Sequence, residues 1–273
     1  MYEMSTFDYV QFNFNWCQTM AKLILAGIVV YNTDLKVLER TIVSLISGSL
    51  VPAIHLLCNS DNQKYRDRVS EMLLAFPVVE LSFRKNFGFG VAHNSLIDSA
   101  KEYEWYLCCN PDIVCSETCI ETLLKFAISK SNAGLIAPRI LSSDGTIQPL
   151  ARKKLTLPTW IHRQLWRVWP QVFRPYEVKF DYERSQEIEF VTGCFFLARV
   201  AELSAVGKFD ERFFIYCEDA DLAFQMSKTK VNYYVAEATV IHCWAKSWSN
   251  SWFGLKHQTA SLWKYFIKNG FFG

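Results

Sequence analysis

Acidic and amide side chains gather in a few short segments of the chain. Asn110-Pro111-Asp112 follows an apolar run. A carboxylate just past a buried strand is well placed to bind a divalent cation, and the cation to bind a diphosphate. Asn-Pro-Asp is also ordinary turn chemistry. Taken alone, the tripeptide therefore favours a plain turn over a metal site.

A second acidic segment contains Glu218, Asp219 and Asp221, three carboxylates within four positions. Like charges this close repel one another, which tends to raise a carboxyl pKa and suits a general base. Charge balance at a helix N-terminus also favours Asp and Glu, but one or two acids would satisfy it. Three acids beside the aromatic run 213–216 indicate a functional site.

Two further features could bind anions. Gly88 and Gly90 lie in a loop before an expected helix, where small residues let the backbone approach a phosphate or a sugar. The segment is not a GxGxxG motif, and a tight strand-to-helix turn is the alternative. His242 ends an apolar strand, where a lone His is usually structural. Beside two acidic clusters it becomes a candidate ligand for a metal or a diphosphate.

The elements that must position these residues alternate in the first half of the chain. Buried strands are predicted over 22–31, 53–57, 78–83, 105–109 and 134–137, and helices over 35–46, 65–76, 92–100 and 115–128. This alternation predicts βαβ units in a doubly wound α/β sheet. Ligands bind at the carboxyl ends of such strands, so one cleft would collect the polar residues that follow them.

The alternation stops after residue 140. The segment 141–184 is rich in loops and Trp, strands are predicted over 190–198 and 233–241, and 222–226 is part of a helix. One aromatic helix is predicted over 248–273. We expect an N-terminal extension (1–21), one domain with a nucleotide-binding core and an acceptor-facing half (22–245), and a C-terminal amphipathic, membrane-proximal helix (246–273).

Composition narrows the classes of protein. The chain has 29 basic and 27 acidic residues, and a net charge of +2 gives no electrostatic field that favours nucleic acid. The apolar content of 51% excludes a disordered protein. Nine Cys without a CxxC pair predict reduced thiols in a cytosolic protein. The 15% aromatic content predicts a ligand platform or a membrane interface.

Six motifs occur in an order that resembles the family 2 glycosyltransferases of the GT-A fold. Within that family the chain is most similar to bacterial rhamnosyltransferases of O-antigen assembly. The resemblance spans about residues 22–268 and is carried by V-x-Y-N (29–32), N-x-G-x-G-x-x-x-N (86–94), N-P-D (110–112), T-G-C-F-F-L (192–197), F-D-E-R-F-F-I-Y-C-E-D-A-D-L (209–222) and His242.

The resemblance implies roles for these residues. Asp112 and His242 would bind Mg²⁺ or Mn²⁺, and Asp219 would be the base that takes the proton of the acceptor hydroxyl, with Glu218 and Asp221 as supporting or acceptor-binding carboxylates. A further set would bind the nucleotide-sugar: Asn32, Asn59, Asn86, Gly88, Gly90, Asn94 and Asn110.

The implied activity is inverting, metal-dependent transfer of L-rhamnose from dTDP-L-rhamnose to a polyprenyl-diphosphate-linked sugar, in O-antigen synthesis. One departure leaves the donor base open. The family's second strand usually ends in Asp-Asn, but Cys58-Asn59 stands here, so base contact could shift to Asn59 or Asp61. The alternatives are a UDP-hexose donor and a catalytically inactive nucleotide-sugar-binding module.

Two segments, 152–174 and 248–268, combine Trp and Phe with basic residues, and 145–176 holds six basic residues and no acid. This pattern predicts contact with an anionic membrane surface, with packing on the core as the alternative. No transmembrane segment is predicted, because the apolar run 23–31 is about half of the ~20 residues needed. Residues 1–20 do not resemble a signal peptide. The expected location is cytoplasmic, peripheral on the inner face of the cell membrane.

Overall fold

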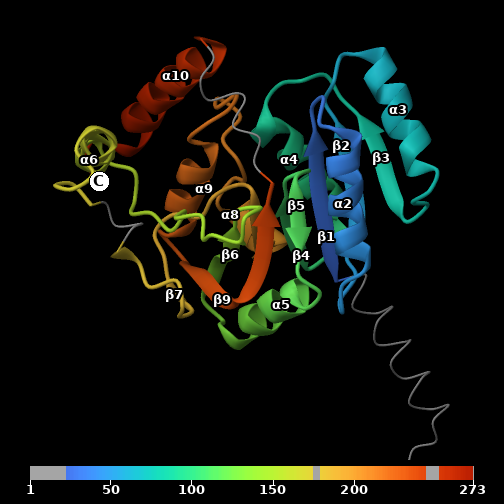
Figure 1. The fold of residues 1–273 in the computed structure, drawn as a ribbon, viewed down its shortest axis with the longest axis horizontal. Coiled ribbons are helices and arrows are strands. Elements are labelled where there is room, and N and C mark those ends of the chain that lie inside the picture. The colour runs from blue at the N-terminus through green and yellow to red at the C-terminus, as the bar shows by residue number, and fades with distance from the viewer. Residues whose placement is uncertain (1–22, 175–178, 244–251, 273) are drawn as a thin grey trace, which may run out of the picture.

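Figure 1 shows the computed structural model of the chain, which describes residues 23–174, 179–243 and 252–272. The predicted extension 1–21 and the start of the predicted C-terminal helix lie outside the described residues. None of the helices formed by the described residues is long and apolar enough to cross a bilayer.

The described strands form one mixed sheet. Its order is β3 (Val79–Phe83), β2 (Ala53–Cys58), β1 (Ile24–Val30), β4 (Trp105–Cys109), β8 (Phe195–Arg199), β6 (Ala133–Leu141), β9 (Val231–His242) and β5 (Ile113–Cys115), with β7 (Gln186–Glu187) paired to β9. The first four strands are parallel, as predicted. Beyond β4 the sheet is mixed, because β8 runs antiparallel to β4 and β6 antiparallel to β8, so β6 keeps the direction of the first four strands.

The sheet curls so that distant strands come together at one edge. β5 follows β4 after only Asn110 to Asp112, yet β8, β6 and β9 separate the two strands in the sheet order. Three linking residues span only about 10–14 Å, so β5 and β9 must fold back toward the carboxyl end of β4. The beginning of β8, the end of β9 and the 110–112 link therefore meet.

Two helical layers cover the sheet. Alternate residues of a strand point to opposite faces, and on β1 Ile28 packs with α2 (Leu35–Ile46), α3 (Gln63–Leu73) and α5 (Cys119–Ser129). Leu25, on the other face of β1, packs with α4 (Phe89–Ser99), α8 (Val200–Ala205) and α9 (Glu218–Met226). This three-layer packing holds the strand ends, and the loops on them, in fixed positions.

The helices α6 (Leu157–Val168) and α10 (Trp252–Asn269) lie beside each other at the end of the molecule away from α2 and α3 (Figure 1). The Leu157 N–H donates to the Phe271 carbonyl over 2.8 Å, just past the end of α10. Tyr265 and Phe266 of α10 are buried with Phe190 and Phe213 in a small third cluster. Part of the aromatic C-terminal segment is therefore core, as the packing alternative proposed.

Some elements differ from the sequence predictions. The helix expected from residue 115 begins at Cys119, because 113–115 form the edge strand β5. The region expected to be loop-rich contains α6, which Thr156 caps through a reciprocal pair of hydrogen bonds with Thr159. The eight described cysteines are all free thiols.

Candidate active site

Asp112 and His242 come together where β5 meets β9. His242 pairs with Ile113 across the two strands, and the Cys243 N–H donates to the Asp112 carbonyl over 2.9 Å. This register places His242 Nε2 3.4 Å from Asp112 Oδ1. On the other side of the ring, His242 Nδ1 lies 3.2 Å from Gln148 Oε1. Residues 130 positions apart in sequence thus share one small polar site.

This pair fits a divalent cation. Asp112 Oδ1 is buried and accepts no hydrogen bond from the described residues, and a carboxylate with an imidazole is a common donor set for Mn²⁺ and related ions. Gln148 also contacts His242 from behind, the arrangement that orients a ligating imidazole. No third His, Cys, Asp or Glu of the described chain joins them, so water or a diphosphate would complete the coordination.

Asn32 and Asn59 end adjacent parallel strands. The Asn59 N–H donates to the Val30 carbonyl over 2.9 Å, and Asn59 Oδ1 is buried without a hydrogen-bond partner in the described structure. Asn32 has a φ of 54° and accepts a hydrogen bond from Ser60 Oγ. Cys58 instead packs inside the core. The neighbouring amides, and not the Cys58 thiol, therefore face the carboxyl edge of the sheet.

The 86–94 segment packs against the chain that leads to α9. Gly88 has a φ of 109°, and a Cβ on it would lie 2.4 Å from the Phe214 carbonyl oxygen. The Asn94 amide is buried, donating to the Phe209 carbonyl and accepting from the Phe209 N–H. Gly90 likewise faces Phe209. The structure gives Gly88, Gly90 and Asn94 packing roles, and their contact with a nucleotide-sugar stays a prediction.

Two other residues that are predicted to bind the nucleotide-sugar stabilise the loops in which they lie. The Asn86 side chain accepts a hydrogen bond from the Gly88 N–H over 3.0 Å. The Asn110 N–H donates to the Cys194 carbonyl over 2.8 Å, which ties the 110–112 link to the segment before β8. The first bond uses only Oδ1 of Asn86, and the second uses only the backbone of Asn110. Both side-chain amides therefore remain candidates for binding the nucleotide-sugar.

Glu218 and Asp219 begin α9 after an unusual turn. Tyr216 and Cys217 have φ values of 69° and 65°, a left-handed conformation that costs about 1–3 kcal/mol for a residue other than Gly and often marks functional sites. Asp219 Oδ2 accepts the Gly193 N–H over 3.2 Å, and Oδ1 accepts the Ala220 N–H over 2.8 Å. These two N–H donors fix the orientation of the Asp219 carboxylate.

The two carboxyl groups perturb each other. Burial, and then the charge of Asp219, raises the pKa of Glu218 to about 8. Burial also raises the pKa of Asp219 above its usual range, while the two N–H donors and Arg152 act in the opposite direction. Glu218 Oε2 is buried without a hydrogen-bond partner among the described residues. Asp219 is the more stabilised anion, so it is the better candidate for a base.

Asp221 has a structural role. Its carboxylate is 1% exposed and accepts hydrogen bonds from Lys268 Nζ over 2.7 Å and Asn269 Nδ2 over 2.8 Å, both on α10. It points away from Asp219 on the far side of the first turn of α9, in a different depression lined by Asp210 and Gln225. In this geometry Asp221 anchors α10, and a supporting or acceptor-binding role for it stays a prediction.

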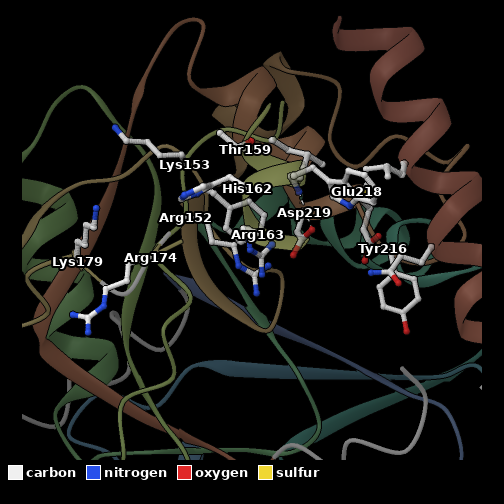
Figure 2. A pocket seen from close by; sticks show the side chains of 17 residues that line it. Arg152, Lys153, Thr159, His162, Arg163, Arg174, Lys179, Tyr216, Glu218 and Asp219 are labelled. Carbon is white, nitrogen blue, oxygen red and sulfur yellow. Dashed lines mark hydrogen bonds between the residues drawn. The ribbon is translucent and has the colours of Figure 1, made fainter. Parts of the chain in front are cut away.

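A cavity of about 500 Å³ opens beside Asp219 and Glu218. Figure 2 shows the two carboxylates at one end, Arg152 and Arg163 near the middle, and Arg174 at the other end. Sequence analysis assigned these arginines to a lipid-facing surface and did not place them in the site. The absence of acidic residues in 145–176 was the signal in the sequence for an anion-binding site. The folded position of α6 is what brings this segment beside α9.

The chain matches the sequence profile described as Glycosyl transferase family 2 over residues 26–207. It is 30% identical over 222 aligned residues to a protein of Mycobacterium tuberculosis strain H37Rv, an N-acetylglucosaminyl-diphospho-decaprenol L-rhamnosyltransferase. The alignment covers 75% of this chain and 71% of the relative. The counterpart from strain CDC 1551 matches equally well.

Solved structures share the fold at lower identity. GalNAc-T7 with UDP, GalNAc and Mn²⁺ gives a TM-score of 0.65 at 14% identity, covering 84% of this chain and 44% of that one. The mannosyltransferase PcManGT from Pyrobaculum calidifontis, in complex with GDP-Man and Mn²⁺, gives 0.64 at 10% identity, covering 97% and 72%. This chain thus spans less than half of the first structure. These likenesses confirm the predicted GT-A fold.

Proposed function

Since the chain belongs to glycosyltransferase family 2, we propose that it transfers L-rhamnose from dTDP-L-rhamnose to a polyprenyl-diphosphate-linked sugar with inversion. The relative from M. tuberculosis, which carries an activity of this kind in its name, supports both the sugar and the acceptor class. The second candidate, transfer from a UDP-hexose by the same site, is supported by the UDP complex of GalNAc-T7 and by the absence of an Asp at position 58.

One observation carries the proposal: Asp219 is a half-buried carboxylate, held by two backbone N–H groups, that opens onto a cavity. Asp219 accepts the proton of the acceptor hydroxyl as that oxygen forms the new bond to the anomeric carbon of the sugar. The bond between the anomeric carbon and the donor diphosphate breaks, and the nucleoside diphosphate leaves with its electron pair. Attack opposite to the leaving group inverts the anomeric centre.

Asp112 and His242 would hold Mg²⁺ or Mn²⁺ beside the donor diphosphate. When bound, the cation supplies positive charge that stabilises the leaving diphosphate. Asn32 and Asn59 lie at the ends of neighbouring strands, where the nucleoside of a donor binds in open α/β sheets. The buried Asn59 Oδ1 is an acceptor for an N–H of the base.

The domain division and location follow from the same proposal. We assign the transferase domain to residues 22–245 and the membrane-proximal segment, which contains α10, to residues 246–273, with the protein peripheral on the inner face of the membrane where a polyprenyl-linked acceptor would be. The support is the exposed apolar surface of α6 and α10, described below, together with basic residues in both segments.

A nucleotide-sugar panel tests the function. The full chain is incubated with Mn²⁺ or Mg²⁺ and dTDP-rhamnose, UDP-glucose, UDP-N-acetylglucosamine or GDP-mannose, and thermal unfolding is measured, because a ligand that binds the folded state raises the midpoint. The selected donor is then combined with a lipid-diphosphate-linked N-acetylglucosamine, and the product is analysed by mass spectrometry. We expect dTDP-rhamnose to give both stabilisation and transfer. A midpoint raised only by UDP-sugars would replace the rhamnose assignment, and binding without transfer would favour an inactive module.

A further inference from the structure

Five basic side chains line the cavity beside Asp219. Arg152 and Lys153 come from the strand-like segment before α6, Arg163 from α6, and Arg174 and Lys179 from the chain that follows. Lys153 pairs with Glu189 at 2.7 Å, so its charge is balanced locally. Among the described residues, Glu218 and Asp219 are the only carboxylates in the lining. A cavity lined by several cationic side chains attracts a multiply charged anion.

This cavity is separate from the donor side of the site. Asp112 and His242, where the donor diphosphate would bind, do not line it, and neither do Asn32 or Asn59. Asp219 stands at the boundary, since Asp219 Oδ2 accepts a hydrogen bond from the Gly193 N–H, two residues before β8. A base between donor and acceptor has the acceptor on the side away from the donor. The basic cavity therefore lies on the acceptor side.

The rest of the lining is apolar. Trp160 belongs to α6, Leu155 to the segment before it and Leu262 to α10. Phe190 also lines the cavity, with the Arg152 guanidinium 5.2 Å from the centre of its ring. One cavity thus offers arginines and hydrocarbon together, between the two helices that carry exposed apolar side chains. A prenyl diphosphate carries the two complementary groups, an anionic diphosphate and an apolar chain, only a few bonds apart.

We propose that Arg152, Arg163 and Arg174 bind the diphosphate of the acceptor, with its first prenyl units against Trp160 and Leu262. The acceptor diphosphate stays intact, and its binding directs the attached sugar's hydroxyl to Asp219. The inference rests on the proposed function for the identity of the acceptor. Arginine suits this role because its planar, permanently charged fork binds phosphate oxygens in pairs.

A binding experiment separates this site from the donor site. Farnesyl diphosphate is titrated into the full chain by calorimetry in EDTA, without any donor, so that the cation site cannot hold the probe. We expect binding by the native protein and weakening of about 100-fold or more in the Arg163→Gln/Arg174→Gln variant, because charge-assisted bonds from two arginines to the diphosphate would be lost. Farnesol, which lacks the diphosphate, should not bind detectably.

Two controls make the result specific. Arg40→Gln removes the same charge from an exposed position on α2 and should leave the affinity unchanged. The double variant should also bind dTDP-rhamnose with Mn²⁺ as the native protein does. Because Arg174 is exposed, Arg174→Gln alone gives a folded comparison if the double variant loses thermal stability.

The proposal is overturned if native and double-variant proteins bind farnesyl diphosphate equally, or if the double variant loses affinity for dTDP-rhamnose instead, since the arginines would then serve the donor. Absence of transfer in the native protein, with arginine-dependent binding of farnesyl diphosphate retained, would count against the proposed function and leave the diphosphate site established.

Discussion

Asp219 and Glu218 are adjacent in sequence but have different surroundings. Two backbone N–H groups and the nearby Arg152 charge stabilise the Asp219 anion, whereas Glu218 is 8% exposed and has one oxygen without a hydrogen-bond partner in the described structure. Two acids whose environments push their pKa values apart take different roles. Asp219 is suited to accept a proton, and Glu218 to stay protonated at neutral pH.

Asp219→Asn should reduce transfer by ~10²–10⁴-fold, because the amide keeps the volume but cannot accept the proton. Donor binding, followed by thermal shift, should remain near native. In the native enzyme, burial raises the pKa of Asp219, so kcat should fall with decreasing pH before an exposed Asp would be protonated. Near-normal turnover in Asp219→Asn would transfer the role of base to Glu218.

The raised pKa of Glu218 predicts a pH-dependent stability. The folded protein keeps a proton that the unfolded chain releases from about pH 4.5, the ordinary Glu value, up to about pH 8. Stability is therefore lost as the pH rises through this window. Glu218→Gln stays neutral, so the difference in unfolding midpoint between variant and native should grow in favour of the variant from pH 5 to 8.5. A constant difference would show that Glu218 ionises normally.

Asp112→Ala and His242→Ala should each weaken metal-dependent donor binding, and EDTA should abolish transfer by the native protein. The readout is the Mn²⁺-dependent rise in unfolding midpoint caused by dTDP-rhamnose. Gln148→Ala keeps both predicted ligands but removes the contact to His242 Nδ1, so a smaller loss is expected. Full transfer in EDTA would contradict the metal assignment, and basic side chains would then have to stabilise the diphosphate.

The sequence predicted which residues meet in the site better than it predicted their structural roles. The motif order led to Asp112, His242 and Asp219, which the fold brings to one edge of the sheet. It named Asp219 as the base but placed Asp221 on the same site, although a two-residue step along α9 turns the side chain about 200° to the other face. The packing of Asn94 on Phe209 depends on a contact across 115 positions, which no local pattern reveals.

At the scale of elements, α10 holds the turn that presents the base. Ser261 Oγ donates to the Ile215 carbonyl over 2.8 Å, and Lys264 Nζ donates to the Arg212 carbonyl over 2.7 Å. Lys268 Nζ contacts Asp210 and Asp221 on either side of that turn. The left-handed Tyr216 and Cys217 lie between these contacts, so α10 holds a backbone conformation that would otherwise be unfavourable.

Lys268→Met should lower the free energy of unfolding by about 3 kcal/mol, because Asp221 would remain buried with its charge unbalanced. It should also make α10 more accessible to limited proteolysis. Lys264→Met removes a lysine four positions away on the same helix but only a bond to a carbonyl, so its cost should stay near or below ~1 kcal/mol. Equal effects of the two changes on urea unfolding would refute the anchoring role of the Lys268–Asp221 pair.

The parallel half of the fold was predictable, because each buried strand reads as an apolar run and each helix as an apolar stripe. The antiparallel half was not. β5 has only three residues and follows a turn motif, so its apolar residues could not be told apart from the start of the next helix. α6 has apolar residues at helical spacing, but its Pro and the arginines between its Trp residues read as a basic aromatic loop, and its Thr156 capping pair is Thr-Thr and not the usual Thr-Glu.

At the scale of the whole molecule, one group of exposed apolar side chains lies on or just after α6 and on α10. Trp169 and Val172, after α6, are 53% and 73% exposed, and Trp263 and Ile267 on α10 are 57% and 76% exposed. Both helices lie at one end of the molecule (Figure 1), and the basic cavity opens between them. Because Arg163 and Arg174 line that cavity, the apolar side chains become the better probe of contact with lipid.

The protein should bind vesicles that contain phosphatidylglycerol, since basic residues gain about 1 kcal/mol each near an anionic surface and buried rings add a part that salt does not screen. Raising salt should weaken binding without abolishing it. Trp263→Ala/Ile267→Ala should weaken co-sedimentation by about tenfold or more, because each large side chain gains about 1.5–3 kcal/mol on full burial. Leu74→Ala, at an 81% exposed position at the end of α3, removes apolar surface from the opposite side and should have no effect. If Leu74→Ala and the α10 variant bind equally, α10 does not face the membrane, and an acceptor that diffuses free of the bilayer becomes the better explanation for the cavity.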